Sequence, residues 1–141
     1  MKTLHRHLPA LLALVCSLSL AQTPPTLYEA LGGEPGVAAL VDGLIQRATA
    51  DARIRDSFKD TNLKELAHQL RDQFCTLTGG PCRYEGDTMQ KVHAGLHIDR
   101  VQFNALVEDL QAAMDACQLP FSTQNRLLAL LAPMHREIIT R

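Results

Sequence analysis

The chain has 141 residues, of which 14 are basic and 15 acidic, and its formal net charge is −1. This length is typical of a single domain. The near-balance of charge provides no basic stripe for a phosphate backbone, so nucleic acid is not an expected partner.

Residues 1–21 have the three-part pattern of a secretory signal peptide. Lys2 and Arg6 give a basic start, a mostly apolar run follows over residues 8–20, and small residues precede a cleavage site after Ala21. The run is short for a bilayer span, and an uncleaved membrane anchor is the alternative. We expect the mature chain, residues 22–141, to be one domain that is periplasmic or secreted and has no membrane contact.

The first half of this domain is predicted to contain one short and two long helices. Residues 26–31 begin with a capping pattern and end at a double glycine. A second helix opens at Pro35, a short connection contains Phe58, and Thr61 or Asn62 caps a third helix. The inward-facing residues repeat every 3.6 positions and are Val37, Leu40, Val41, Leu44, Ile45, Ala48, Leu63, Leu66, Leu70, Phe74 and Leu77.

The second half is predicted to contain a short helix, a long helix and a kinked last helix. Asp87 or Thr88 caps the short helix, which Gly95 ends. Asp99 caps the long helix, which Pro120 breaks. The inward-facing residues of the long helix are Phe103, Leu106, Val107, Leu110, Ala113, Met114 and Cys117.

The last helix is capped by Ser122 or Thr123 in this interpretation. Pro133 should kink it, because proline removes a backbone donor and clashes with the preceding turn. No segment alternates with a period of two, so the predicted fold class is all-α. The inward-facing residues of the last helix are Leu127, Leu130, Leu131, Met134 and Ile138.

Three cysteines lie in the expected mature chain. Cys75 and Cys82 are separated by a turn that contains Gly79 and Gly80, which allows a sharp reversal of the backbone. In an oxidising compartment a structural disulfide is favoured, with two free thiols as the alternative. Cys117 is interpreted as a small buried hydrophobic residue.

His93 is the first candidate for a metal ligand. A neutral imidazole can bind haem iron through one nitrogen while a backbone carbonyl holds the other. The alternatives are an ordinary core or surface histidine, and a zinc site shared with His97. Gly95 argues against zinc because it ends the helix that both histidines would share. The sequence also lacks a nucleophile elbow, a phosphate loop and an isolated pair of carboxylates, which argues against a hydrolase.

Four motifs together resemble the group I truncated haemoglobins. They are Leu-Tyr-Glu-Ala-Leu-Gly-Gly at 27–33, Thr-Gly-Gly-Pro at 78–81, Arg-Tyr-Glu-Gly at 83–86, and the segment 89–98 around His93. They occur in order and are correctly spaced, and the resemblance runs from about residue 27 to residue 138. It implies a truncated globin, in which a two-over-two helical sandwich encloses haem b.

The resemblance also implies which side chains contact the cofactor. His93 corresponds to the proximal ligand of the iron, and Phe58 corresponds to the aromatic residue that packs on the porphyrin. The implied distal wall is Leu66, Leu70 and Phe74, the implied proximal wall is Met89, Val92 and Ile98, and the further cofactor contacts are Ile45, Gln69, Gln73 and Tyr84.

Two departures from the family pattern affect the distal side. Ile45 stands where many members have a tyrosine, and Leu70 stands where members often have a glutamine. A mostly apolar distal side would deprive bound oxygen of a hydrogen bond, and would suit carbon monoxide or nitric oxide better. Gln69 and Gln73 could swing inward, and His68 is a candidate second ligand in a bis-histidine iron site.

The expected function is reversible binding of a diatomic gas, namely oxygen, nitric oxide or carbon monoxide. An electron-donor protein is a further candidate partner. The alternative is a haem enzyme that detoxifies nitric oxide or performs peroxidase-like redox chemistry, so enzymatic activity stays open. A third hypothesis is a helical interaction module without haem.

Overall fold

The computed structural model describes residues 23–141. The expected signal peptide, residues 1–21, lies outside the described residues. Every regular element within the described range is helical, which confirms the all-α class. None of these helices is long and apolar enough to span a bilayer.

The helices occur as one short element, two long ones, one short element and a final helical pair. In chain order they are α1 (Leu27–Ala30), α2 (Gly33–Ala50), a 3-10 turn (Arg55–Phe58), α3 (Leu63–Leu77), α4 (Met89–Val92), α5 (Arg100–Ala116), α6 (Phe121–Leu131), a second 3-10 turn (Ala132–Met134) and α7 (His135–Ile138).

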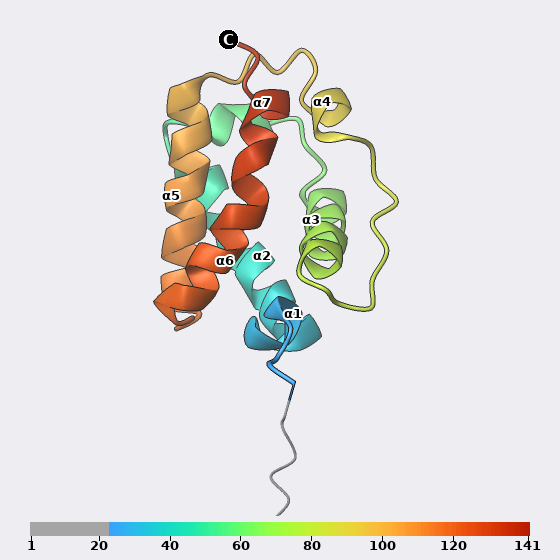
Figure 1. The fold of residues 1–141 in the computed structure, drawn as a ribbon. Helices are drawn as coiled ribbons and strands as arrows, with labels where there is room; N and C mark the ends of the chain where they lie inside the picture. Colours follow the sequence, from blue (N-terminus) through green and yellow to red (C-terminus); the bar gives the residue numbers. More distant parts are fainter. Residues whose placement is uncertain (1–22) are drawn as a thin grey trace, which may run out of the picture.

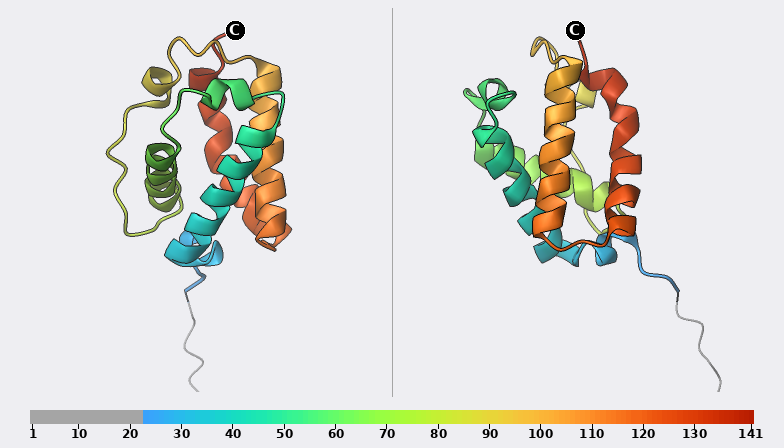
Figure 2. Two further views of the ribbon diagram at one scale, coloured as in Figure 1. Left: turned by 180° about the vertical axis from the view of Figure 1, so that it is seen from behind. Right: turned by 90° about the vertical axis from the view of Figure 1, so that its left-hand side faces the viewer.

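The long helices form two pairs, α2 with α3 and α5 with α6. In Figure 1, α5 and α6 run antiparallel beside each other, and α3 is seen almost end-on. The views in Figure 2 show the same antiparallel pair and show that α2 crosses it. α2 packs against both α3 and α5, so it joins the two pairs. The main core lies along α2 and consists of Leu27, Leu31, Val37, Leu40, Val41, Leu44, Phe74, Leu110, Ala113, Met114 and Leu127.

Most of the expected helix starts are confirmed by their caps. The Thr26 hydroxyl accepts a hydrogen bond from the backbone N–H of Glu29, whose carboxylate accepts one from the backbone of Thr26. The side chains of Asn62, Thr88 and Asp99 likewise accept a hydrogen bond from a backbone N–H in the first turn of α3, α4 and α5, and the Asp99 cap also has the reciprocal bond. These side chains satisfy backbone donors that the first turn of a helix leaves unpaired.

The expected start of the last helix is wrong. α6 begins at Phe121, and its N-cap is Pro120 rather than Ser122 or Thr123. Gln118 adopts a left-handed conformation (φ 55°), which reverses the chain after α5, and the fixed φ of Pro120 then begins the next helix. Thr123 therefore lies inside the first turn of α6 and is buried.

The expected kink at Pro133 is confirmed. α6 ends at Leu131, and the chain continues through a 3-10 turn at Ala132–Met134 into α7. α7 lies against α4. The backbone N–H of Thr140 donates to the carbonyl of Ile98 at 2.9 Å, so the end of the chain is tied to the segment that follows α4.

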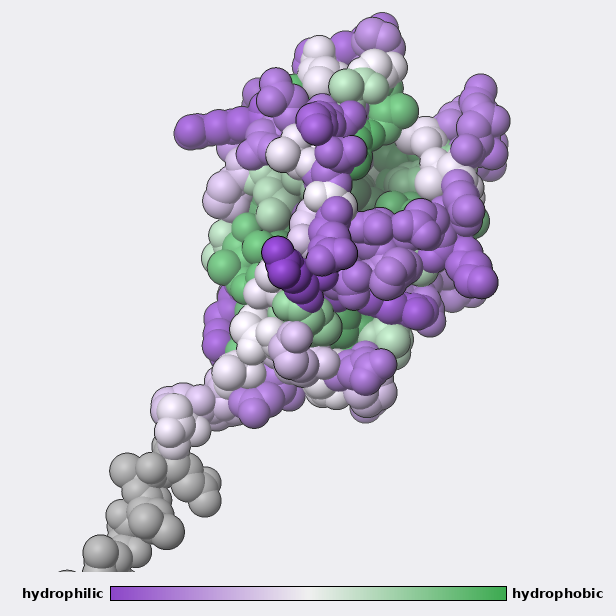
Figure 3. Space-filling view, turned by 90° about the vertical axis from the view of Figure 1, so that its right-hand side faces the viewer, coloured by the Kyte–Doolittle hydropathy of each residue, from purple (hydrophilic) through white to green (hydrophobic). Residues whose placement is uncertain are grey.

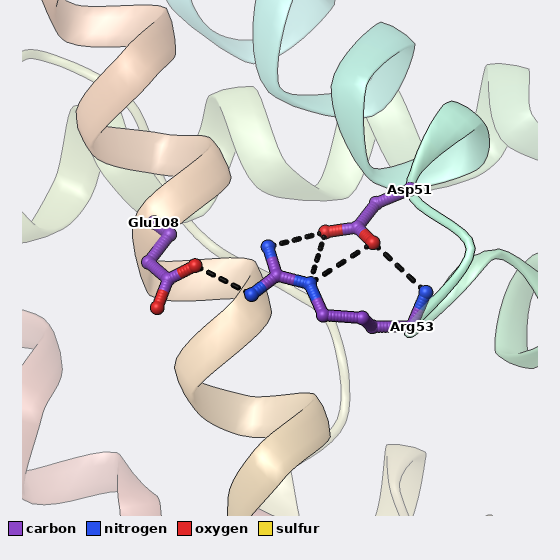
Figure 4. Close-up of polar contacts among 3 residues, drawn as sticks. All are labelled: Asp51, Arg53 and Glu108. Carbon is purple, nitrogen blue, oxygen red and sulfur yellow. Dashed lines mark hydrogen bonds and ion pairs between the residues drawn. The ribbon is translucent and has the colours of Figure 1, made fainter.

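A surface ion network joins the end of α2 to α5. The guanidinium of Arg53 contacts the carboxylate of Asp51 at 2.7 Å and that of Glu108 at 2.6 Å (Figure 4). The hydrogen bonds from Arg53 hold the pKa of Asp51 below its usual value. The network therefore attaches the connection after α2 to the middle of α5, although exposed ion pairs contribute little to stability.

Cys75 and Cys82 form a disulfide, with their Cα atoms 5.7 Å apart. Cys75 is buried near the end of α3, and Cys82 lies in the loop that leads to α4. The bond therefore ties this loop to α3. Among the described residues Cys117 is a free thiol, half-buried against the main core, as expected.

Removal of this disulfide should lower the free energy of unfolding by about 2.5 kcal/mol, because a closed loop of this length restricts the unfolded chain by that amount. The variant is Cys75→Ala combined with Cys82→Ala, and urea unfolding measures the change. Reduction of the wild-type chain should have a similar effect, whereas reduction of the double variant should have none. Equal stability of the oxidised wild type and the double variant would contradict the prediction.

Candidate functional site

An apolar cavity of about 590 Å³ opens beside α3 and α4. Its walls come from α2, the first 3-10 turn, α3, the loop before α4, α4 itself, α5 and α7. Figure 3 shows a hollow in the face that carries α3 and α4, with hydrophobic atoms inside and hydrophilic atoms around it. A volume of this size can enclose a small organic ligand or a cofactor.

His93 stands at the end of α4 and lines this cavity. Its ring atom Nδ1 lies 2.8 Å from the carbonyl oxygen of Met89, one helical turn earlier. A carbonyl can only accept a hydrogen bond, so Nδ1 carries the proton and donates. In the neutral ring the other nitrogen, Nε2, then has a lone pair for a metal. This is the arrangement that orients a histidine ligand.

The short helix that carries His93 has a clear local cause. The Thr88 side chain accepts from the backbone N–H of Lys91 and begins the helix. Gly95 has a φ of 77°, which favours glycine, and it turns the chain away after one helical turn. His93 is therefore presented by a turn that is held at both ends.

The wall contributed by α3 is mixed in polarity. Leu66 and Leu70 are half-buried and line the cavity. Gln69 also lines it, but its amide donates to the carboxylate of Glu65 at 2.8 Å. Gln73 is buried, and its Nε2 lies 3.3 Å from the sulfur of Met89. Of the two glutamines, Gln73 is the more deeply buried.

A second apolar cavity of about 540 Å³ lies next to the first, between α5 and α6. His93 and Gln73 line both cavities. Phe74, which is expected on the distal wall, lines only the second cavity and belongs to the main core. The two cavities therefore form adjoining apolar spaces around His93.

The structure brings together most of the residues singled out from the sequence. Phe58 ends the first 3-10 turn and lines the first cavity, and Ile45 lines it from α2. The remaining expected residues on its walls are Leu66, Gln69, Leu70, Gln73, Tyr84, Met89, Val92, His93 and Ile98.

The loop before α4 supplies a polar part of the rim. The Tyr84 hydroxyl donates to the backbone carbonyl of Asp87 at 2.8 Å. Burial, together with the nearby charge of Asp87, raises the pKa of the Tyr84 phenol. The hydrogen bond from Tyr84 holds the loop in place.

Two histidines do not join the site. His68 points outward, with 64% of its side chain exposed, and its Nδ1 lies 3.6 Å from the carboxylate of Asp72. The suggested role of His68 as a second iron ligand does not fit this position, because the helical period turns it away from the cavity-lining stripe of α3. His97 is exposed and adopts a left-handed conformation (φ 54°) outside α4. Within residues 23–141 no group of three potential metal-binding side chains occurs, so the zinc alternative gains no support.

Several cavity residues were not singled out as site residues. The helical spacing of apolar residues predicted that many of them face inward. This spacing cannot distinguish a residue in the packed core from a residue that lines a cavity. The larger of these are Leu44, Ile54, Leu96, Gln102, Phe103, Leu106 and Ile138.

Comparison with known families and sequences gives one consistent result. The family model described as bacterial-like globin matches residues 26–140. A group 1 truncated hemoglobin from Tetrahymena thermophila is 36% identical over 90 residues, which are 64% of this chain and 74% of that protein. The group 1 truncated hemoglobin GlbN from Mycolicibacterium paratuberculosis is 30% identical over 117 residues, which are 83% of this chain and 86% of that protein.

The solved structures agree with the sequence comparison. The truncated hemoglobin from Tetrahymena pyriformis in its Fe(III) form superimposes with a TM-score of 0.79 and 27% identity, over 83% of this chain and 100% of that chain. The expected two-over-two arrangement of the helices is therefore confirmed.

Proposed function

The chain belongs to the bacterial-like globins, within the group 1 truncated haemoglobins, and on this premise we propose that it binds haem b with His93 as the proximal ligand. We further propose that the haem held in this way would bind a diatomic gas reversibly. The observation that carries the proposal is the pairing of the His93 Nδ1 atom with the Met89 carbonyl at 2.8 Å, beside an apolar cavity.

The residues around the cavity fit haem. Nε2 of His93 is the lone-pair donor that the iron needs, and the Met89 carbonyl holds the ring. Phe58 and Leu66 offer apolar surfaces to a flat macrocycle. When bound, haem supplies an iron centre that binds diatomic gases, and the chain holds, orients and shields that centre from water.

The composition of the α3 wall supports gas binding over peroxidase-like chemistry. Peroxidase-like chemistry needs a group that can move a proton beside the iron, such as an imidazole or a carboxylate. The side chains that α3 places on the first cavity are two leucines and two glutamines. A glutamine amide donates hydrogen bonds but does not titrate. This wall can therefore stabilise a bound gas, and it offers no proton-transfer group to a reaction.

Titration of the purified chain with haem tests the proposal. We expect one haem per chain, an optical spectrum of a histidine-ligated haem, and a reversible spectral change when the reduced protein meets carbon monoxide. Mixing the oxygenated protein with nitric oxide and measuring nitrate separates gas binding from dioxygenase activity. Failure to bind haem in a stoichiometric ratio would overturn the proposal and favour an interaction module without haem.

A further inference from the structure

The loop between α3 and α4, residues 78–88, forms one side of the first cavity. Four consecutive residues of this loop, 84–87, line the cavity. The loop follows α3, which contributes another wall, and leads into α4, whose C-cap is His93. The position of the loop therefore determines how far this side of the cavity is open to solvent.

Few non-covalent contacts hold the loop against α3. In the part of the chain that the structure describes, no backbone-to-backbone hydrogen bond involves residues 81–87. The Thr76 hydroxyl donates to the Cys82 carbonyl at 3.3 Å, which is a long and therefore weak hydrogen bond. Gly86 packs beside the Gln69 side chain, where a Cβ atom would collide with it. The ion pairs of the loop join it to itself or to α4, and not to α3.

The disulfide between Cys75 and Cys82 is the covalent link between the loop and α3. Cys75 lies in the last turn of α3 and is 2% exposed, and Cys82 lies near the start of the segment that has no backbone hydrogen bonds. The intact bond allows the loop to move only about Cys82, whereas breaking it frees residues 78–88 as one length of chain. Local opening of this kind needs less free energy than unfolding of the whole domain. Reduction should therefore open the cavity before it unfolds the helices.

Resting on the function proposed above, we propose that the Cys75–Cys82 disulfide is a site of thiol–disulfide exchange, and that its reduction by a dithiol accelerates the release of haem. With the bond intact, residues 84–87 stay in place as one side of the cavity that haem would fill. With the bond broken, the loop moves away from α3 and leaves this side open. The oxidation state of two cysteines thus controls how long the protein retains its cofactor.

Cys82 provides the sulfur that a reductant attacks, because Cys82 is half-buried whereas Cys75 is enclosed by the protein. A thiolate of the dithiol forms a bond to the Cys82 sulfur, the S–S bond of the protein breaks, and Cys75 leaves as a thiolate that takes up a proton. The second sulfur of the dithiol then displaces Cys82, and the reductant becomes a disulfide. Two electrons and two protons pass from the dithiol to the protein, so two cysteine thiols are formed.

Transfer of haem from the loaded protein to an excess of an apoglobin acceptor measures the rate of release. After treatment with dithiothreitol, we expect the wild type to release haem between about 5-fold and 70-fold faster, where the upper limit corresponds to losing the whole entropic contribution of the closed loop. Cys75→Ala combined with Cys82→Ala should release haem at the fast rate with or without dithiothreitol. Reoxidation of the wild type should restore the slow rate.

Cys117→Ala is the matched control, because Cys117 is a free thiol that is half-buried against the main core. This variant should respond to dithiothreitol as the wild type does. The proposal is overturned if the oxidised wild type and the double variant release haem equally fast, if dithiothreitol still accelerates release from the double variant, or if Cys117→Ala abolishes the response.

Trypsin cleavage of the haem-free chain gives a readout that does not involve the cofactor. The side chain of Arg83 is 87% exposed in the loop, whereas Arg126 lies inside α6. Reduction should make the bond after Arg83 cleavable while the bond after Arg126 stays intact, because cleavage in a helix requires unfolding. Equal cleavage after Arg83 in the oxidised and reduced chains, or simultaneous cleavage at both sites, would overturn the proposal.

Failure of the oxidised wild type to take up haem would instead refute the proposed function. Because trypsin cleavage reports the motion of the loop without haem, the two failures are distinguishable.

Discussion

Replacement of His93 by alanine should abolish stoichiometric haem binding while leaving the helical fold intact. The Nε2 atom of His93 is the free imidazole nitrogen on the cavity wall, and the ring is held from behind by Met89. Loss of a group that merely supports a metal ligand typically costs 10- to 100-fold in affinity, so loss of the ligand itself should cost more than about 100-fold. Haem titration followed by absorbance measures the change, and far-ultraviolet circular dichroism verifies the helices.

His97→Ala is the matched control, because His97 lies four residues away, is exposed and lies outside the cavity. It should bind haem as the wild type does. Imidazole added to His93→Ala should restore part of the wild-type spectrum, since a small ring can occupy the space that the side chain leaves. Normal haem content and an unchanged spectrum in His93→Ala would show that another group binds the iron.

Leu127→Ala should lower the free energy of unfolding by about 2 to 5 kcal/mol, the range for truncating a fully buried leucine. Leu127, on α6, is 0% exposed and belongs to the main core. Its loss would leave a void that neighbouring helices cannot close without moving. Urea unfolding of the oxidised protein measures the change.

Leu130→Ala provides the comparison on the same helix. Leu130 is 39% exposed, although the apolar period of the sequence places it inward with Leu127. Its truncation should change the free energy of unfolding by less than about 0.5 kcal/mol, as is usual for surface positions. Equal losses for the two variants would mean that α6 is rotated from the orientation described here.

The sequence could predict the cavity wall formed by α3 only in part. The period of α3 placed Leu66, Leu70 and Phe74 on one stripe, and all three line a cavity. The same period places Gln69 and Gln73 beside this stripe, and it does not indicate which of the two side chains faces inward. The difference between them arises from neighbours that are distant in sequence, because Gln73 is covered by Met89 and Met134 whereas Gln69 bonds within its own helix.

The start of the last helix shows a similar limit. Ser122 and Thr123 have suitable side chains for a cap, and nothing local distinguishes them from Pro120. The left-handed turn at Gln118 and the burial of Thr123 against the core make Pro120 the cap. The intrinsic preference of serine and threonine for the N-cap position was therefore outweighed by the packing of α6 on the rest of the fold.

The amino-acid sequence by itself determined the helical class, most helix caps, the kink at Pro133 and the candidate ligand His93. These features depend on neighbours within a few residues, such as the carbonyl of Met89 that holds the His93 ring. Only the tertiary structure decided that Gln73 is buried whereas Gln69 is not, that Phe74 belongs to the main core, and that Leu130 is exposed. Their environments are set by elements that lie far apart in the chain, and a helical period carries no information about which partner covers each face.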